Sequence, residues 1–182
     1  SILLNQYIFY NTMGAGASIA EHQHAQVVDP LEIKVDNEIV PYPILNQSFV
    51  SRERVNNKED VFRLKNYAVD ALIFSGSDAP YKAQYAAHIL ESEGHPYNIL
   101  VNKNEVFVIG RNPKREISVC IVRKIWGYEL SGIALLGDIE ETPSHLYVKV
   151  KGAKIFSNMT HEILAKNLRA ATVPLDGLAR RI

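Results

Sequence analysis

The sequence is poor in three things that mark common classes of protein: net charge, cysteine and long apolar runs. Twenty basic residues balance twenty acidic residues, so the formal net charge is zero. A polyanion would meet no overall attractive field, and we expect no nucleic-acid partner. The single cysteine, Cys120, excludes an internal disulfide framework and a zinc site built from several thiolates. One thiol favours a reducing compartment, and its apolar neighbours indicate a buried core position.

Polar residues interrupt every apolar run well before the roughly twenty residues that a membrane-crossing helix needs. We therefore expect a soluble, cytoplasmic protein with no membrane partner. The chain opens at Ser1 in a strand-like run, without the basic, apolar and small-residue zones of a signal peptide. This opening indicates that sequence upstream of Ser1 is missing.

With 182 residues, the chain has room for one ordinary domain or for part of a larger one. Alanines and Leu90 at helical spacing predict a helix that starts at Ala79. Ser77 or Asp78 can cap its start, and Gly94 stops it. This helix is the clearest element of secondary structure in the sequence.

Apolar runs rich in β-branched residues predict a sheet. The expected strands are 2–10, 22–28, 67–74, 98–101, 106–109, 117–123, 133–136 and 146–150. Residues 98–109 are expected to form a hairpin with a four-residue connection. Thr160 can cap a second helix to about Ala171, and a tail with Pro174 follows it. These elements predict an α+β fold with a mostly antiparallel sheet and flanking helices.

The chain is expected to be one domain, or the C-terminal part of one, in four consecutive regions. Residues 29–66 are polar and contain Pro41 and Pro43, which indicates a long excursion over the surface. The regions are a catalytic strand segment (1–28), this surface excursion (29–66), a second sheet–helix unit (67–150), and a C-terminal helix and tail (151–182).

Two histidines and a glutamine carry the sharpest chemical signal. In a strand, alternate side chains share a face, so His22, His24 and Gln26 are expected to line up on one side. A neutral imidazole is a competent nucleophile near pH 7, and a neighbouring histidine can hold it in the needed tautomer. Gln26 can donate to a phosphate oxygen. Two other interpretations stay open: a metal half-site made by the two imidazoles, and plain exposed strand residues.

A small-residue segment lies just upstream of these histidines. Its glycines allow main-chain N–H groups to approach a phosphate, Ser18 adds a hydroxyl and Asn11 adds an amide donor. The Gly-x-Gly alone is weak evidence, because it lacks the lysine of a P-loop and the third glycine of a dinucleotide fingerprint. A phosphate cradle beside a histidine nucleophile nevertheless makes a coherent transfer site.

Residues 9–18 followed by 21–26 resemble the active-site segment of the histidine-triad superfamily branch that uses His-x-His-x-Gln. That branch includes galactose-1-phosphate uridylyltransferase, diadenosine tetraphosphate phosphorylase and the GDP-hexose phosphorylases. Residues 96–101 with 106–111 resemble a hairpin of the two phosphorylase groups, and residues 126–136 are similar to a segment of the GDP-hexose group. The resemblance favours the GDP-hexose phosphorylases, with the diadenosine tetraphosphate enzymes close behind.

The resemblance implies a histidine-triad-like (HIT-like) fold and a nucleotidyltransferase that works in two displacements. His24 would attack the α-phosphorus of a nucleoside diphosphate sugar or a dinucleoside polyphosphate, and inorganic phosphate or a sugar phosphate would then take the nucleotide. His22 would support His24, while Gln26 and Ser18 would hold non-bridging oxygens. No metal or other cofactor is required at the histidines.

The resemblance also implies how the phosphate chain is held. The residues expected to bind it are Asn11, Gly14, Ala15 and Gly16, with Lys103 and Arg111 as weaker candidates. A lone basic residue at a strand end is usually only solvated. Asn98 and Glu129 fall in the matched segments, where turn formation or structural hydrogen bonding explains them as well as catalysis does.

The sequence departs from this family in one large respect. Its enzymes have an additional N-terminal half that supplies most of the nucleotide-base pocket, and this chain lacks it. We therefore expect a second chain, an N-terminal fragment or a homo-oligomer to complete the sheet. Two further functions stay open: nucleotide hydrolysis at the same histidine, and a degenerate, non-catalytic subunit of a larger assembly.

Overall fold

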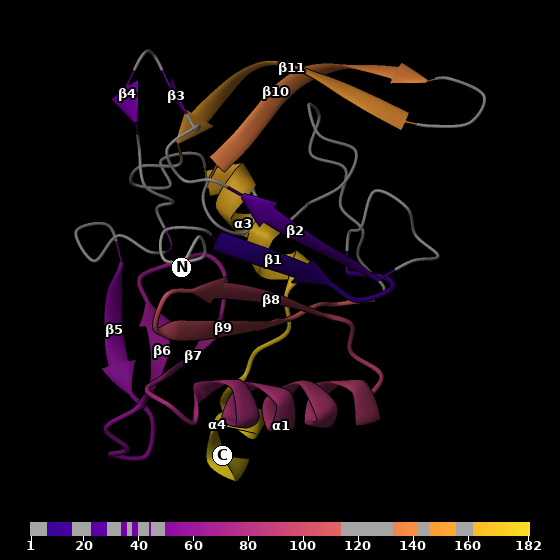
Figure 1. Ribbon diagram of the computed structural model, residues 1–182. Helices are drawn as coiled ribbons and strands as arrows, with labels where there is room; N and C mark the ends of the chain where they lie inside the picture. The colour runs from indigo at the N-terminus through magenta and orange to yellow at the C-terminus, as the bar shows by residue number, and fades with distance from the viewer. Residues whose placement is uncertain are drawn as a thin grey trace.

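A seven-stranded sheet organises the molecule (Figure 1). The computed structural model describes residues 7–15, 23–28, 34–35, 38–39, 44, 50–113, 133–141, 146–155 and 162–182. The sheet has the strand order β2-β1-β8-β9-β7-β6-β5, and every neighbouring pair is antiparallel. Its strands are β1 (Tyr7–Asn11), β2 (His24–Val28), β5 (Ser51–Arg54), β6 (Val61–Lys65), β7 (Leu72–Ser75), β8 (Tyr97–Asn102) and β9 (Glu105–Gly110).

Two separate hairpins and three helices complete the described part of the chain. One hairpin joins β3 (Lys34–Val35) to β4 (Glu38–Ile39), and the other joins β10 (Ile133–Glu141) to β11 (Leu146–Ile155). The helices are α1 (Ala79–Ser92), α3 (Glu162–Ala171) and α4 (Asp176–Arg181). The expected α+β class with an antiparallel sheet is confirmed. None of these helices combines the length and the apolar character needed to cross a bilayer.

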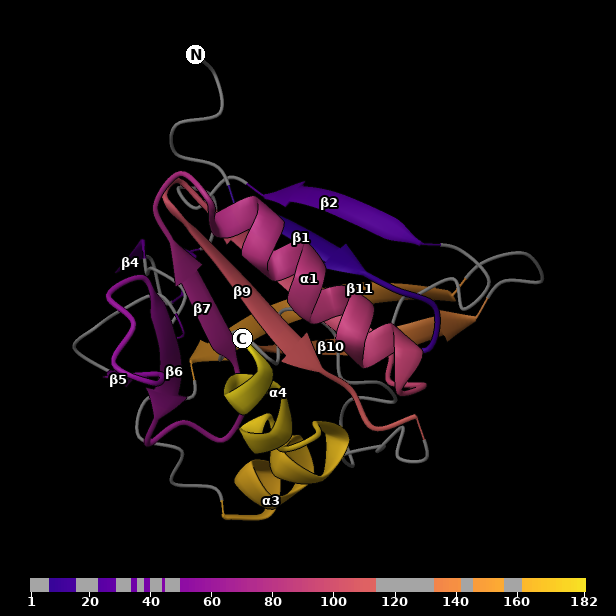
Figure 2. The same cartoon turned by 90° about the horizontal axis from the view of Figure 1, so that it is seen from below.

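Helix α1 forms where its alanines predict it, and these alanines pack on one face of the sheet. Ala83, Ala86 and Leu90 are buried against Leu72 and Val108. Asp78 is the N-cap residue, as expected, but its side chain makes no capping hydrogen bond. Figure 2 shows α1 running along the sheet.

The C-terminal helices cover both faces of the sheet. Leu168 and Ala171 of α3 pack with Phe107 and Ile109 on the face opposite α1. Leu178 of α4 belongs instead to the core beneath α1. The link between the two helices therefore crosses the end of β9. The expected tail after Pro174 contains a short helix (Figure 2).

The crossing needs a glycine at the end of β9. A Cβ atom at Gly110 would lie 2.5 Å from Cγ2 of Val173 and 3.1 Å from Cδ2 of Leu90. The Val173 N–H donates to the Gly110 carbonyl at 3.1 Å. The absence of a side chain thus lets the C-terminal segment approach the β9 backbone.

The prediction that residues 29–66 are a surface excursion is wrong for their C-terminal part. Residues 51–54 and 61–65 form β5 and β6, which extend the main sheet on one side. Val61 and Leu64 are buried, whereas three of the four residues of β5 are exposed. The polar character of an edge strand concealed it, because exposed edges are commonly protected by charged residues.

Smaller differences concern the boundaries of elements. The connection between β8 and β9 is the two residues Lys103 and Asn104, not four. Strand β7 begins at Leu72, five residues later than expected. The strand predicted at 117–123, Cys120 and Thr160 lie outside the described residues.

Candidate functional site

The strand that carries the histidine motif pairs with the strand that leads into the glycine turn. In the antiparallel pair β1–β2, His24 is the partner of Asn11 and Gln26 is the partner of Phe9. Directly opposed residues in such a pair occupy the same face of the sheet. Position 24 therefore lies on the face of Asn11, at the end of the strand pair. His22, Gly16 and Ser18 lie outside the described residues.

The turn that follows β1 is fastened to the start of β8. The Thr12 hydroxyl donates to the Tyr97 carbonyl at 2.9 Å and accepts from the Tyr97 N–H at 2.8 Å. Gly14 has a φ of +76°, a conformation that glycine adopts without strain. The Ala15 N–H donates to the Thr12 carbonyl at 3.0 Å. The Ala15 amide, expected to bind phosphate, is therefore already used inside the turn.

Three buried polar side chains form a row behind this turn. Asn11, Asn98 and Arg111 are 6%, 4% and 3% exposed. Nη1 of Arg111 donates to Oδ1 of Asn98 at 3.2 Å. Nδ2 of Asn98 donates to Oδ1 of Asn11 and, at 3.0 Å, to the Ala15 carbonyl. We call Arg111, Asn98 and Asn11 the amide row.

Arg111 is buried because the C-terminal segment covers the end of β9. Its N–H donates to the Pro96 carbonyl at 2.7 Å, and it forms an isolated antiparallel bridge with Thr172. The next residue, Asn112, donates its N–H to the Ala171 carbonyl at 3.0 Å. Arg111 is thus not the solvated strand-end residue that its sequence context indicates.

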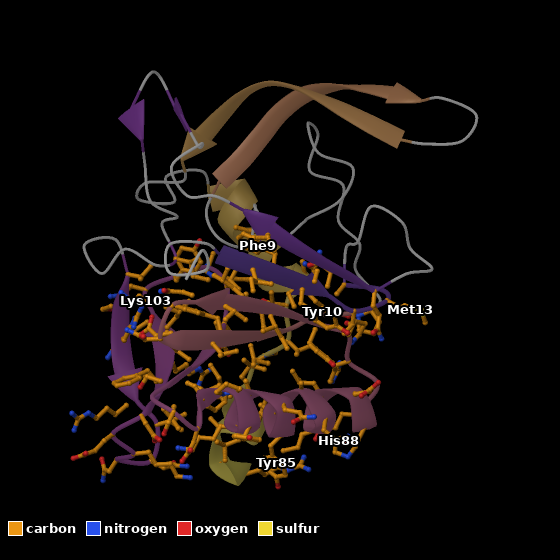
Figure 3. The ribbon with its side chains drawn as sticks, in the orientation of Figure 1. Phe9, Tyr10, Met13, Tyr85, His88 and Lys103 are labelled. Carbon is orange, nitrogen blue, oxygen red and sulfur yellow. The ribbon has the colours of Figure 1, made fainter. Side chains whose placement is uncertain are left out.

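Lys103 does not join this group. It is exposed in the turn between β8 and β9, at the opposite end of β8 from Asn98. Five residues of extended strand separate the two positions by about 16 Å. Figure 3 shows Lys103 and Met13 at opposite ends of the sheet. The structure therefore does not bring Lys103 together with Arg111 and Asn11, and a phosphate contact of Lys103 stays a prediction.

Aromatic side chains lie on the other face of the same strand ends. The Tyr10 hydroxyl donates to Oε1 of Gln23 at 2.7 Å, just before β2. The Tyr10 and Tyr97 ring centroids are 6.3 Å apart. Burial raises the pKa of Tyr97, and the neighbouring Tyr10 and Glu91 add to this effect. The Tyr97 phenol therefore loses its proton only at a higher pH than an ordinary tyrosine does.

The amide row gives the site its electrostatic character. A guanidinium is positively charged at any pH that a protein meets, and a carboxamide can donate a hydrogen bond without adding negative charge. In the described part of the chain, no group of three or more histidine, cysteine, aspartate or glutamate side chains could hold a metal ion. A buried guanidinium and two carboxamides suit an anion or a neutral hydrogen-bond acceptor better than a cation.

Asn98 is the residue that sequence reasoning left undecided. Asn98 shares the buried face of β8 with Leu100, so it is a polar residue on the buried side of an apolar strand. That position was the available signal, since buried polar side chains need partners. Its partners could not be named from the sequence, because Asn11 and Asn98 are 87 residues apart.

Comparison of the chain with protein-family models, with curated proteins and with solved structures gives no match.

Proposed function

We propose that this chain carries the nucleotidyl-transfer centre of a HIT-like phosphorylase, with His24 as the nucleophile. The observation that carries the proposal is the pairing of position 24 with Asn11, at the end of a row that contains a buried arginine. A nucleophile next to fixed donors suits a reaction in which negative charge accumulates on phosphoryl oxygens.

The proposed reaction proceeds in two displacements on a nucleoside diphosphate sugar, with GDP-hexose favoured. An imidazole nitrogen of His24 forms a bond to the α-phosphorus. The bond from that phosphorus to the bridging oxygen breaks, and the sugar 1-phosphate leaves with the electron pair. An oxygen of inorganic phosphate then attacks the same phosphorus, which releases a nucleoside diphosphate and restores the imidazole.

The residues around His24 have distinct parts in this proposal. His22 orients the His24 imidazole, while Gln26 and Ser18 donate to the non-bridging oxygens of the α-phosphate. Asn11 donates from the neighbouring strand. A dinucleoside polyphosphate would react by the same two displacements. A second chain, an N-terminal fragment or a second copy would complete the pocket for the base.

The test is to trap the intermediate. The unsubstituted chain, His24→Ala and His88→Ala are incubated with GDP-hexose and dinucleoside polyphosphate labelled at the α-phosphorus, then denatured at alkaline pH. His88 is the matched control, because it is an exposed histidine on α1. We expect an acid-labile, protein-bound label in the unsubstituted chain and His88→Ala, reduced at least about a hundredfold in His24→Ala.

Three results would change the proposal. Label that persists in His24→Ala removes this histidine from the nucleophilic role. No label in the unsubstituted chain with either substrate shows that this chain by itself does not carry the transfer centre. Release of a nucleoside monophosphate without inorganic phosphate favours hydrolysis at the same histidine.

A further inference from the structure

The orientation of a side-chain amide decides what it can bind. A carboxamide has an acceptor, Oδ1, and a donor, Nδ2, which exchange places when the group turns by half a rotation. A site that presents Nδ2 of Asn11 attracts a phosphoryl oxygen, whereas one that presents Oδ1 repels it. The direction of the Asn11 amide is therefore a property on which ligand choice depends.

The partners of Asn98 leave its amide one orientation. A guanidinium can only donate, so Oδ1 of Asn98 faces Arg111. A backbone carbonyl can only accept, so Nδ2 of Asn98 faces Ala15. These two contacts on opposite ends of the amide fix Asn98 independently of each other.

The fixed Asn98 in turn orients Asn11. Because Nδ2 of Asn98 donates to Asn11, the group that faces it is the acceptor Oδ1. Nδ2 of Asn11 therefore points away from β8, and on that side of β1 lies β2 with position 24. Among the described residues, Nδ2 of Asn11 donates to no acceptor.

We propose that Arg111 and Asn98 are positioning residues that hold the Asn11 amide with Nδ2 facing a phosphoryl oxygen of the ligand. The inference rests on the proposed function, which puts that oxygen next to position 24. Arg111 acts through Asn98 and does not touch the ligand. Hydrogen bonds in a row polarise one another, so the buried guanidinium strengthens Nδ2 of Asn11 as a donor.

Asn98→Asp keeps a side chain of the same shape at position 98 and reverses the bond to Asn11, while the Ala15 carbonyl loses the hydrogen bond from Nδ2. A carboxylate accepts from Arg111 as an ion pair, so the contact between residue 98 and the buried arginine is kept. It has no hydrogen to give to Asn11, whose amide must turn and donate Nδ2 to the carboxylate. Oδ1 of Asn11 then faces the ligand, where an acceptor meets an acceptor.

The experiment measures binding rather than turnover. Inorganic phosphate and GDP are titrated separately into the full chain, and the affinity and the side-chain amide resonances are recorded. In the unsubstituted chain, we expect the resonances of the Asn11 Nδ2 hydrogens to shift on binding. In Asn98→Asp, we expect the affinity for both probes to fall at least about tenfold. A response to GDP alone shows that the site reads a nucleotide phosphate and not free phosphate.

Asn104→Asp is the matched control. It makes the same change in the same hairpin, at an exposed turn residue at the far end of β8. We expect it to bind both probes as the unsubstituted chain does. Equal weakening by Asn104→Asp and Asn98→Asp would show a general effect of negative charge and would overturn the inference.

The outcomes separate this inference from the proposed function. A trapped adduct in the unsubstituted chain, together with unchanged binding by Asn98→Asp, keeps the transfer mechanism and overturns the amide row. If phosphate shifts the Asn11 amide resonances but no adduct is trapped, the amide row is kept and the transfer mechanism is overturned. If Asn98→Asp does not fold, the test relies on the resonances of the unsubstituted chain. Resonances of the Asn11 Nδ2 hydrogens that shift with neither phosphate nor GDP would overturn the inference.

Discussion

A largely buried arginine lies at each end of the β8–β9 hairpin, and the two arginines have different hydrogen-bond partners. At one end, Arg52 of β5 makes a two-pronged ion pair with Glu105, and its guanidinium lies 5.6 Å from the centre of the Phe107 ring. Its side chain is 12% exposed. At the other end, Arg111 is 3% exposed and donates to the amide of Asn98.

The two partners differ in whether they can donate a further hydrogen bond to another residue. A carboxylate only accepts, so the hydrogen bonds that begin at Arg52 end at Glu105. A carboxamide accepts and donates, so the bonds that begin at Arg111 continue through Asn98 to Asn11 and Ala15. The first arrangement joins two strands, while the second connects β9 through β8 to the end of β1. The predictions below test this contrast.

The largest effect is expected for Asn98→Leu. It removes the hydrogen bonds that Asn98 makes with Arg111, Asn11 and the Ala15 carbonyl at once, and each buried hydrogen bond that is lost costs about 1–3 kcal/mol. We expect the free energy of unfolding to fall by about 3 kcal/mol or more, measured by urea denaturation. A fall of less than about 1 kcal/mol would mean that the hydrogen bonds of the amide row do not contribute to stability as expected.

An intermediate effect separates the two ends by paired substitution. Replacing a buried ion pair with apolar residues is often neutral. We expect Glu105→Leu alone to cost about 2 kcal/mol and the double variant Arg52→Leu, Glu105→Leu to recover most of that loss.

The matching double variant at the amide row has a different expected outcome. Arg111→Leu with Asn98→Leu still leaves Asn11 and the Ala15 carbonyl without their donor, so we expect it to remain about 2 kcal/mol less stable than the unsubstituted chain. Urea denaturation of both doubles provides the comparison. If both double variants recover their stability, or if neither does, the distinction between the Arg52–Glu105 pair and the amide row is removed.

The smallest effect is expected at an exposed ion pair, which provides a baseline for both ends. Arg63 donates to Asp176, whose side chain is 59% exposed, and this hydrogen bond lowers the pKa of Asp176 below its ordinary value of 3.8. A lowered carboxyl pKa stabilises the fold above the unfolded pKa, and this stabilisation is lost as the pH falls through the folded pKa.

Asp176→Asn is therefore expected to cost less than about 1 kcal/mol at pH 7, because exposed ion pairs contribute little. The difference from the unsubstituted chain should shrink as the pH falls below 4. Urea denaturation at pH 7 and pH 3 measures both values. A difference that grows on acidification would contradict the sign of this pKa change.

The parts of the fold that follow from local sequence were predictable. Ala79, Ala83, Ala86 and Ala87 recur at helical spacing, and all four are buried in or beneath α1. Apolar runs located β8 and β9 because most of their residues pack against other parts of the core. Strand β5 was missed because its residues 52–54 are Arg, Glu and Arg, so its sequence shows no apolar period.

The candidate site was predictable only in part, since its geometry depends on pairing between distant strands. Asn11 was found because it adjoins the glycine turn. Asn98 gained its role from the register between β1 and β8, and Arg111 gained its burial from Thr172 on a later segment. Lys103 was grouped with Arg111 by its charge, and charge alone does not indicate which end of a hairpin a residue occupies.

The crossing of the C-terminal segment over β9 has a consequence for the order in which the protein is made. Asn112 and Ala170, which share a hydrogen bond in this crossing, are 58 residues apart in the chain. A ribosome can release the β8–β9 hairpin and let it close while α3 is still untranslated. Thr172 cannot pair with Arg111 until it has emerged, so a nascent chain can form its β8–β9 hairpin before the C-terminal segment covers Arg111.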